Sequence, residues 1–278
     1  MAGRRSLAPS SQVSFPRART SLARTSLART VLPPLAALLV LLIGWQLYVM
    51  LSAVEPRILP SPLRVVEQGW RQREIIADHA LATLTVTLIG FGISLVVAWV
   101  LAIWIDFVPG LRTAVLPLLV ASQTLPIIAI APLMILWFGF GLLPKVLVIV
   151  LVTFFPIALG LIEGFSAAGP RAGALLRAMG ASRWQQFRYV RLPAALPRFF
   201  TALRIGITYA VVGAIFAEYV GAVEGLGIYM SLQKNSFRTD LVLAAVAVTA
   251  ALSVSLFLVT YLVERLVVPW NRAGAGRG

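Results

Sequence analysis

The segment from Ala174 to Pro193 has the residue types and spacing best suited to binding a partner. It reads ALLRAMGASRWQQFRYVRLP and lies between long apolar runs. Trp184, Phe187 and Tyr189 stand beside arginines, a combination in which aromatic rings fill a groove and guanidinium groups fix the register. A basic helix lying on anionic lipid is the alternative interpretation. We favour docking onto a soluble protein.

Local signals predict how this segment folds. A short helical piece is expected over Arg171–Met179, followed by a break at Gly180. Ser182 with Gln185 three residues later forms a capping-box pattern, so a second helix is predicted from Ser182 to Val190. The segment is therefore expected to be structured, as a docking surface requires.

Residues for catalysis are scarce. The chain has no cysteine and a single histidine, His79, which excludes thiolate catalysis, disulfides and clustered Cys or His metal sites. We expect His79 to be an interfacial or loop residue, and we expect no metal site and no catalytic residues. No phosphate-binding GxxxxGK[ST] loop surrounds Lys145 or Lys234, so this chain is not expected to bind ATP by that route.

Glu218 is the one acid placed well inside an apolar run. Because a charge at the centre of a bilayer costs about 2.5 to 3.5 kcal/mol, its carboxylate must face protein or water. A hydrogen bond to a neighbouring helix is the favoured role, and direct contact with a transported substrate is the alternative. A single such acid does not provide the series of carboxylates expected of a proton-coupled carrier.

The composition places these residues in a membrane. Of the 278 residues, 59% are hydrophobic and 12% are charged, too few polar side chains to cover a water-soluble globule. The net charge of +14 would suggest nucleic acid in a soluble protein. Here the arginines lie in blocks that flank apolar runs, where they contact lipid headgroups, so we exclude nucleic acid as a partner.

The fold class is predicted to be all-α, a polytopic membrane protein with six transmembrane helices. About 20 apolar residues cross a bilayer core of about 30 Å. The predicted spans are Val31–Val54, Ala80–Ile105, Ala114–Phe138, Leu142–Gly164, Phe199–Val220 and Leu241–Val263. Prolines 117, 126 and 132 in the third span, and 144 and 156 in the fourth, should kink or break those helices.

Charge sets the expected orientation. Residues 1–30 contain six arginines and no acid, and we expect them to form a disordered basic cytoplasmic tail, with an organellar transit peptide as the alternative. The segment 171–204 carries seven arginines and no acid, whereas the other long connections balance both signs. The positive-inside rule therefore places this segment, the amino terminus and the tail 271–278 in the cytoplasm.

The spacing of the basic segment resembles a known motif. Gly180 is followed after nine residues by Val190, Arg191, Leu192 and Pro193. This resembles the loop by which permease subunits of bacterial ATP-binding-cassette importers engage their ATPase, with the pattern Glu-Ala-Ala, three residues, Gly, nine residues, Ile, one residue, Leu-Pro. Ala174 stands where the pattern has Glu.

Three further segments resemble the permeases of the nitrate, sulfonate and taurine importer group. They are ILPSPLRVV at Ile58–Val66, SQTLPIIAIAPLMILWFGFGLLPK at Ser122–Lys145 and AEYVGAVEGLGIYM at Ala217–Met230. The resemblance covers nearly all of Ile58–Trp270. It implies an importer permease fold over residues 31–270, with a coupling loop at 165–197.

The resemblance also implies a non-catalytic role and a set of partners. These are a cytoplasmic ATPase dimer that binds ATP and Mg²⁺, an extracytoplasmic solute-binding protein and a second permease, expected to be an identical copy, all in or at the bacterial plasma membrane. No cofactor is expected in this chain. The residues assigned to ATPase coupling are Ala174, Leu176, Arg177, Gly180, Ala181, Trp184, Phe187, Val190, Leu192 and Pro193.

The cargo is the least constrained prediction. SQTLPIIAIAP and WFGFGLLPK look most like permeases for riboflavin or thiamine-pyrimidine precursors, and no inward-facing cation is evident in the spans to attract an anion. The residues assigned to the translocation path are Gln123, Thr124, Pro126, Phe138, Phe154, Tyr209 and Glu218. Import of an alkanesulfonate, taurine or nitrate is the alternative. An energy-independent channel or secondary carrier is less favoured, because neither needs an ATPase-docking loop.

Overall fold

The computed structural model describes residues 22–52, 54–108 and 110–270, most of which are helical, with no strand among them. The chain divides into two units, Met1–Ala53 and Val54–Gly278. The described part of the first unit is a single helix, α1 (Leu22–Ser52), whose apolar portion Leu32–Ser52 is long enough to cross a membrane.

Helix α1 starts within the predicted amino-terminal tail. Residues 22–30 are helical, although the sequence predicts disorder through residue 30. Leu, Ala and Arg are good helix formers, and lengthening an existing helix adds one hydrogen bond per residue without a new nucleus. The remainder of that tail, residues 1–21, and the predicted tail 271–278 lie outside the described residues.

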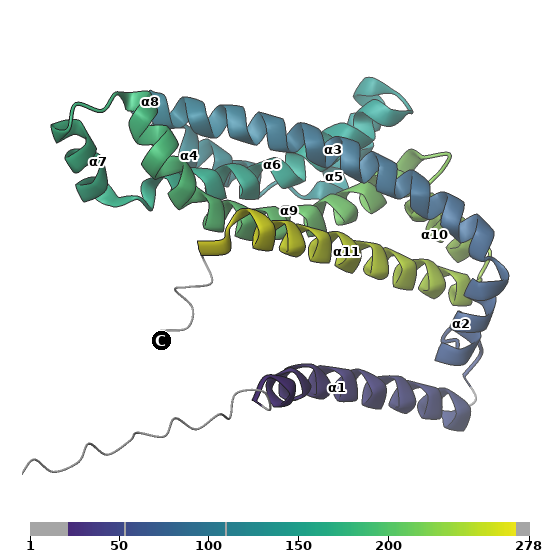
Figure 1. Cartoon of the computed structure of the whole chain (residues 1–278). Helices are drawn as coiled ribbons and strands as arrows, with labels where there is room; N and C mark the ends of the chain where they lie inside the picture. Colours follow the sequence, from purple (N-terminus) through teal and green to yellow (C-terminus); the bar gives the residue numbers. More distant parts are fainter. Residues whose placement is uncertain (1–21, 53, 109, 271–278) are drawn as a thin grey trace, which may run out of the picture. The chain divides into compact units, whose positions relative to one another are not determined.

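The other helices of the described residues lie in the second unit (Figure 1). They are α2 (Pro62–Arg71), α3 (Arg73–Phe107), α4 (Leu111–Ser122), α5 (Ile127–Phe138), α6 (Leu142–Ser166), α7 (Gly169–Ala178), α8 (Arg183–Gln186), the π-helix η1 (Phe187–Arg191), α9 (Leu192–Gly221), α10 (Leu226–Asn235) and α11 (Thr239–Val267).

Five of the six predicted spans correspond to single long apolar helices, and the third is broken. Its halves, α4 and α5, meet at 94°. Pro126 is the N-cap of α5; it has no N–H to continue α4, and it disfavours helical geometry at Leu125. The break expected from the prolines is therefore confirmed for this span.

The fourth span is not broken at its prolines, so the predicted kink or break does not include a break. The helix α6 runs from Leu142 to Ser166 with Pro144 and Pro156 inside it. Pro144 lies in the first turn, where a backbone N–H would have no intrahelical acceptor in any case. Around Pro156 the neighbouring Thr153 and Ile157 are buried, so packing in the bundle holds this part of the helix.

The core of the second unit is built from α3, α6 and α9. A Cβ added to Gly160 would lie 2.4 Å from the Cβ of Ala202, and one added to Gly164 would lie 2.8 Å from the Cα of Ala195. Two glycines separated by three residues therefore let the backbones of α6 and α9 approach closely, as small residues do between membrane helices. Aromatic side chains, including Trp99 against Phe165 and Phe199, fill the wider part of the core.

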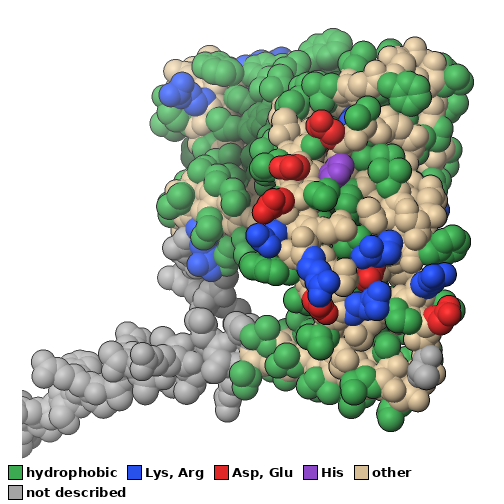
Figure 2. Space-filling view, turned by 90° about the vertical axis from the view of Figure 1, so that its right-hand side faces the viewer, with side chains coloured by type: hydrophobic (Ala, Val, Ile, Leu, Met, Phe, Trp, Pro, Cys, Tyr) green, Lys and Arg blue, Asp and Glu red, His purple; other side chains and the backbone are tan. Residues whose placement is uncertain are grey.

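The long helices run between two opposite ends of this unit. The helices α7 and α8 lie at one end, here called the loop end, and α2 and α10 lie at the other, here called the α10 end (Figure 1). The 35 residues of α3 span about 52 Å, enough to connect both ends across a bilayer. Acidic and basic side chains are interspersed at the α10 end (Figure 2).

Candidate functional site

The first half of the predicted coupling loop ends in a glycine-dependent turn. After α7, Gly180 has φ +80°, and its N–H donates to the carbonyl oxygen of Arg177 at 2.9 Å. The N–H of Ala181 donates to the carbonyl oxygen of Leu176, also at 2.9 Å. This is a Schellman arrangement, in which a left-handed residue satisfies the last carbonyls of a helix. The break predicted at Gly180 is confirmed.

The second half begins with the predicted capping box. The N–H of Gln185 donates to Ser182 Oγ at 3.2 Å, and the N–H of Ser182 donates to Gln185 Oε1 at 2.7 Å. Two backbone donors at the helix start are thereby satisfied reciprocally. The two turns fix the direction of the chain on both sides of Ala181.

The helix that starts at Ser182 does not end at Val190, which corrects the prediction. Helix α8 continues through η1 into α9, forming one helical segment from Arg183 to Gly221. In η1 the N–H of Leu192 donates to the carbonyl oxygen of Phe187, five residues back. The wider π-turn passes directly into the first turn of α9, where Pro193 is tolerated because it needs no intrahelical acceptor.

The side chains of the loop face two ways. Phe187 is buried against Phe107 and Phe165, so its ring anchors the loop to the bundle. Trp184 stacks on Phe187 and is 57% exposed.

The remaining predicted coupling residues lie on or near the surface. Ala174, Arg177 and Gly180 are exposed, whereas Leu176, Ala181, Val190, Leu192 and Pro193 are half-buried. Sequence reasoning left three exposed apolar or aromatic side chains out of the assigned set: Leu175, Met179 and Tyr189. The loop thus offers several large exposed side chains around Trp184.

An ion pair joins the loop to α3. Arg191 Nη1 lies 2.6 Å from Asp106 Oδ1 and 2.8 Å from Oδ2, with the Asp106 side chain 15% exposed. The sequence gives no signal for this pair, because 85 residues separate its members. A movement of the loop is therefore linked to the end of α3 by a charged contact as well as by the aromatic cluster.

Near the other end of α9, Glu218 is fully buried and hydrogen-bonded. Its Oε2 accepts from Thr83 Oγ1 of α3 at 2.9 Å and from the N–H of Gly227 at 3.0 Å. The same Thr83 oxygen accepts from the N–H of Leu226 at 2.8 Å. The predicted hydrogen bond between helices is confirmed. The carboxylate has no exposed surface in this chain.

The sequence missed the residues that complete this site. His79 lies in α3 and is half-buried, and its Nδ1 accepts from the N–H of Gly225 at 3.1 Å. Gly225 has φ +124°, and a Cβ there would lie 2.2 Å from the Cδ of Glu218. The start of α10 is thus held by Glu218, Thr83 and His79, the last two supplied by α3.

The other predicted path residues are dispersed. Gln123, Thr124 and Pro126 are exposed in the break between α4 and α5. Phe138 at the end of α5 and Tyr209 in α9 are each 49% exposed, whereas Phe154 of α6 packs against the core.

The structure also corrects the view that the spans contain no cation. Arg204 lies inside the predicted fifth span, and its Nη1 is 3.4 Å from Glu264 Oε2 of α11. Both side chains are largely buried, at 22% and 12% exposure. The charge of Arg204 is therefore matched by a neighbour.

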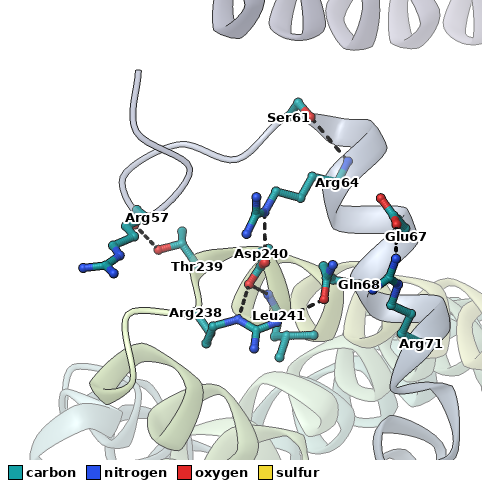
Figure 3. A network of polar contacts seen from close by, with 10 residues as sticks. All are labelled: Arg57, Ser61, Arg64, Glu67, Gln68, Arg71, Arg238, Thr239, Asp240 and Leu241. Atoms are coloured by element: carbon teal, nitrogen blue, oxygen red, sulfur yellow. Dashed lines mark hydrogen bonds and ion pairs between the residues drawn. The ribbon is translucent and has the colours of Figure 1, made fainter. Parts of the chain in front are cut away.

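A second polar network lies at the α10 end (Figure 3). Asp240 is nearly fully buried and accepts from Arg64 Nε and Arg238 Nε, both at 3.1 Å, and from the N–H of Leu241 at 2.9 Å. Arg238 also donates to Gln68 of α2 at 3.1 Å. These contacts fasten α2 to the start of α11.

Beside this network, the phenol of Tyr229 donates to Gln72 Oε1 at 2.7 Å. Burial raises the pKa of this phenol, and the charge of Arg238 partly opposes that shift. The Tyr229 hydroxyl therefore stays protonated and remains a donor. Among the described residues, no group of three or more His, Asp or Glu side chains is arranged to hold a metal ion.

Residues 109–272 match the family model described as binding-protein-dependent transport system inner membrane component. The chain belongs to this family. It is the permease component of an ATP-binding-cassette importer and a multi-pass protein of the inner membrane. The family match covers α4 to α11 and so includes the whole of the predicted coupling loop.

Curated relatives match along most of their length. A riboflavin transport system permease of Chloroflexus aurantiacus is 38% identical, with 84% of this chain and 88% of the relative covered. A formylaminopyrimidine transport permease of Halalkalibacterium halodurans is 35% identical, with 87% and 96% covered. The taurine transport system permease of Escherichia coli is 30% identical, with 85% and 89% covered.

One solved structure supports the fold independently. A chain from the crystal structure of an amino acid ABC transporter superposes with a TM-score of 0.60 at 15% identity. The match covers 72% of this chain and 97% of that one. At this identity the likeness concerns the fold alone, which is that of an ATP-binding-cassette permease.

Proposed function

We propose that the coupling loop, residues 165–197, binds a cytoplasmic ATPase dimer that holds ATP and Mg²⁺ and performs the hydrolysis. One observation carries this proposal: the loop is fixed to the bundle by Phe187 and Arg191 while Trp184 and its neighbours stay exposed. Exposed aromatic side chains can bind a partner, and a loop fixed to the bundle can pass a movement of that partner on to the transmembrane helices. The loop lacks the acid that its family pattern has at Ala174, so apolar contacts and arginines would provide the binding.

Gly180→Pro tests this proposal. Proline cannot adopt a φ of +80° and removes the hydrogen bond to Arg177, so Trp184 should be misdirected while the spans still insert. We expect loss of ATPase co-purification and of substrate-stimulated ATP turnover in lipid vesicles. Gly139→Pro is the matched control for ATPase co-purification, because Gly139 has φ +75° and its N–H donates to Ile135, away from the loop. Normal assembly and turnover in Gly180→Pro would contradict the proposal.

The α10 end, in this arrangement, faces outward and receives a solute-binding protein. Two observations support this placement of the solute-binding protein. The α10 end lies opposite the loop end, and it carries interspersed acidic and basic side chains (Figures 1 and 2). Both termini are then cytoplasmic, in keeping with the distribution of arginines. The exposed apolar side chains of α5, such as Leu136 at 77% and Trp137 at 62%, suit contact with an identical second permease or with lipid.

The cargo of this importer is a vitamin or vitamin precursor, such as riboflavin or a thiamine pyrimidine precursor. The support is the higher identity to riboflavin and formylaminopyrimidine permeases than to the taurine permease. The uncharged side chains proposed for the path, Gln123, Thr124, Phe138, Phe154 and Tyr209, suit a flat polar heteroaromatic ring. Arg204 does not favour an anion, because Glu264 matches its charge.

Uptake by the assembled importer distinguishes this cargo from an alkanesulfonate, taurine or nitrate. Labelled riboflavin, hydroxymethylpyrimidine and taurine are each supplied to cells that express the permease together with its ATPase and its solute-binding protein. Uptake of either heteroaromatic compound, with none of taurine, is the expected result. Binding of the same compounds to the isolated binding protein provides a check that does not depend on the permease.

A further inference from the structure

A cavity of about 430 Å³ lies at the loop end, between the coupling loop and the bundle. Its walls come from the end of α3, the start of α4, the end of α6, α7 and η1. The polar and charged side chains that line it are Asp106, Arg112, Ser166, Arg177, Gln186 and Arg191. A smaller adjoining cavity of about 220 Å³ adds Arg183 to the same group.

The charge around these cavities is unbalanced. Four arginines and one carboxylate line them, which leaves three positive charges without an acidic partner in the lining. Asp106 is engaged by Arg191, and Arg112 donates to the neutral hydroxyl of Ser166 at 2.7 Å. Arg177 makes no ion pair with any described residue. Because no acid lies between Glu163 and Glu218 in the sequence, α7, α8 and η1 cannot supply a counter-charge.

Two helix starts add positive potential to this wall. Gly110 is the N-cap of α4 and Gly169 begins α7, and both line the cavity. Neither helix has a side-chain cap hydrogen bond. The amino-terminal end of a helix carries about half a positive charge and favours anions. The two helix starts and the arginines therefore attract the same kind of ligand.

We propose that this cavity binds a phosphate group, supplied either by a free phosphate compound or by the headgroup of an anionic phospholipid. Arginine matches the geometry of phosphate oxygens through paired N–H donors, and Arg177 and Arg112 both line this cavity. Since α7 and η1 form part of the wall, the bound anion bridges the coupling loop to α4 and α6. The site thus stabilises one position of the loop, a role separate from the proposed docking to ATPase.

Phosphate binding is measured first on the full chain in neutral detergent. Inorganic phosphate is titrated against chloride at equal ionic strength, and thermal unfolding reports the apparent affinity. Arg177→Gln should weaken the affinity about tenfold, the loss of one charge-assisted hydrogen bond. Arg188→Gln is the matched control, because Arg188 is exposed on η1 and lines neither cavity. Equal affinity in wild type and Arg177→Gln, or no effect of phosphate beyond chloride, overturns the proposal.

Nanodiscs distinguish the two sources of phosphate. With phosphatidylcholine alone, a persisting phosphate-dependent stabilisation identifies a free phosphate compound. With added phosphatidylglycerol, retention of that lipid by wild type and Arg188→Gln, but not by Arg177→Gln, identifies the headgroup. The titration is repeated on the importer assembled with its ATPase. Loss of phosphate binding there would mean that an acidic ATPase side chain occupies the cavity, and this overturns the proposal.

Discussion

Gly225→Ala is expected to destabilise the protein through Glu218 as well as through the backbone. Gly225 has φ +124° and ψ 160°, a region essentially restricted to glycine, so alanine there costs about 1 to 3 kcal/mol. The new Cβ would also lie 2.2 to 2.5 Å from all three atoms of the Glu218 carboxylate group. The carboxylate must then move and leave the hydrogen bonds from Thr83 and Gly227, at about 1.5 to 3 kcal/mol each.

Gly141→Ala separates these two effects. Gly141 has φ 140° and ψ −159°, and like Gly225 it is the N-cap of a helix, but no atom lies within 4 Å of its hypothetical Cβ. It therefore bears the backbone cost alone. We expect Gly225→Ala to be less stable than Gly141→Ala by about 3 to 6 kcal/mol, the sum of the two lost hydrogen bonds.

The assay is equilibrium unfolding of the detergent-solubilised chain by increasing SDS in mixed micelles. Removing the obstructing carboxylate with Glu218→Ala should recover part of the loss in the Gly225→Ala background, a non-additive result that reports direct contact. Equal destabilisation by Gly225→Ala and Gly141→Ala would refute the reasoning. Strict additivity of Gly225→Ala with Glu218→Ala would do so too.

The other predictions concern one contact each. Glu218→Gln should retain more uptake than Glu218→Leu, because the amide still accepts hydrogen bonds whereas Leu leaves buried donors unsatisfied at about 1 to 3 kcal/mol; equal and complete loss at normal membrane abundance would indicate an essential charge. Gly160→Leu should cost about 3 kcal/mol by forcing α6 from α9, whereas Gly92→Leu, with open space around its Cβ, should cost little; similar unfolding midpoints would contradict this. Asp106→Asn should weaken substrate-stimulated ATP turnover, because it releases Arg191 of η1, and it should lower the stability by about 1 kcal/mol. The control Asp78→Asn, at an exposed position, should leave turnover unchanged. Unchanged turnover in both variants would argue against transmission through the Asp106–Arg191 pair.

Local patterns in the sequence predicted the local structure well. The capping box at Ser182, the turn at Gly180 and the break before Pro126 each depend on residues within a few positions of one another. Hydropathy likewise located the spans, because a bilayer requires long apolar helices. The continuation of α8 into α9 past Pro193 was not predicted, since tolerance of a proline depends on the position of the helix start.

Contacts between distant segments could not be predicted from one sequence. Thr83 with Glu218 and Asp106 with Arg191 are separated by 135 and 85 residues, and neither pair has a local signature. The burial of Phe187 could not be predicted for a related reason. An aromatic residue on a basic helix can face a partner or its own bundle, and only the packing against Phe107 and Phe165 decides between them.

The right-angled break between α4 and α5 has a consequence for the order of assembly during synthesis. Each half has 12 residues and is about 18 Å long, too short to cross a hydrocarbon core alone. The partners that bury Ala131 of α5, namely Val148 of α6 and Ala217 of α9, are made later. At about 5 to 20 residues per second, the interval from Phe138 to Gly221 lasts about 4 to 17 seconds. During that interval the broken span is not stably inserted in lipid on its own. We expect it to be protected from the surrounding lipid and water at the site of synthesis until α6 and α9 are made.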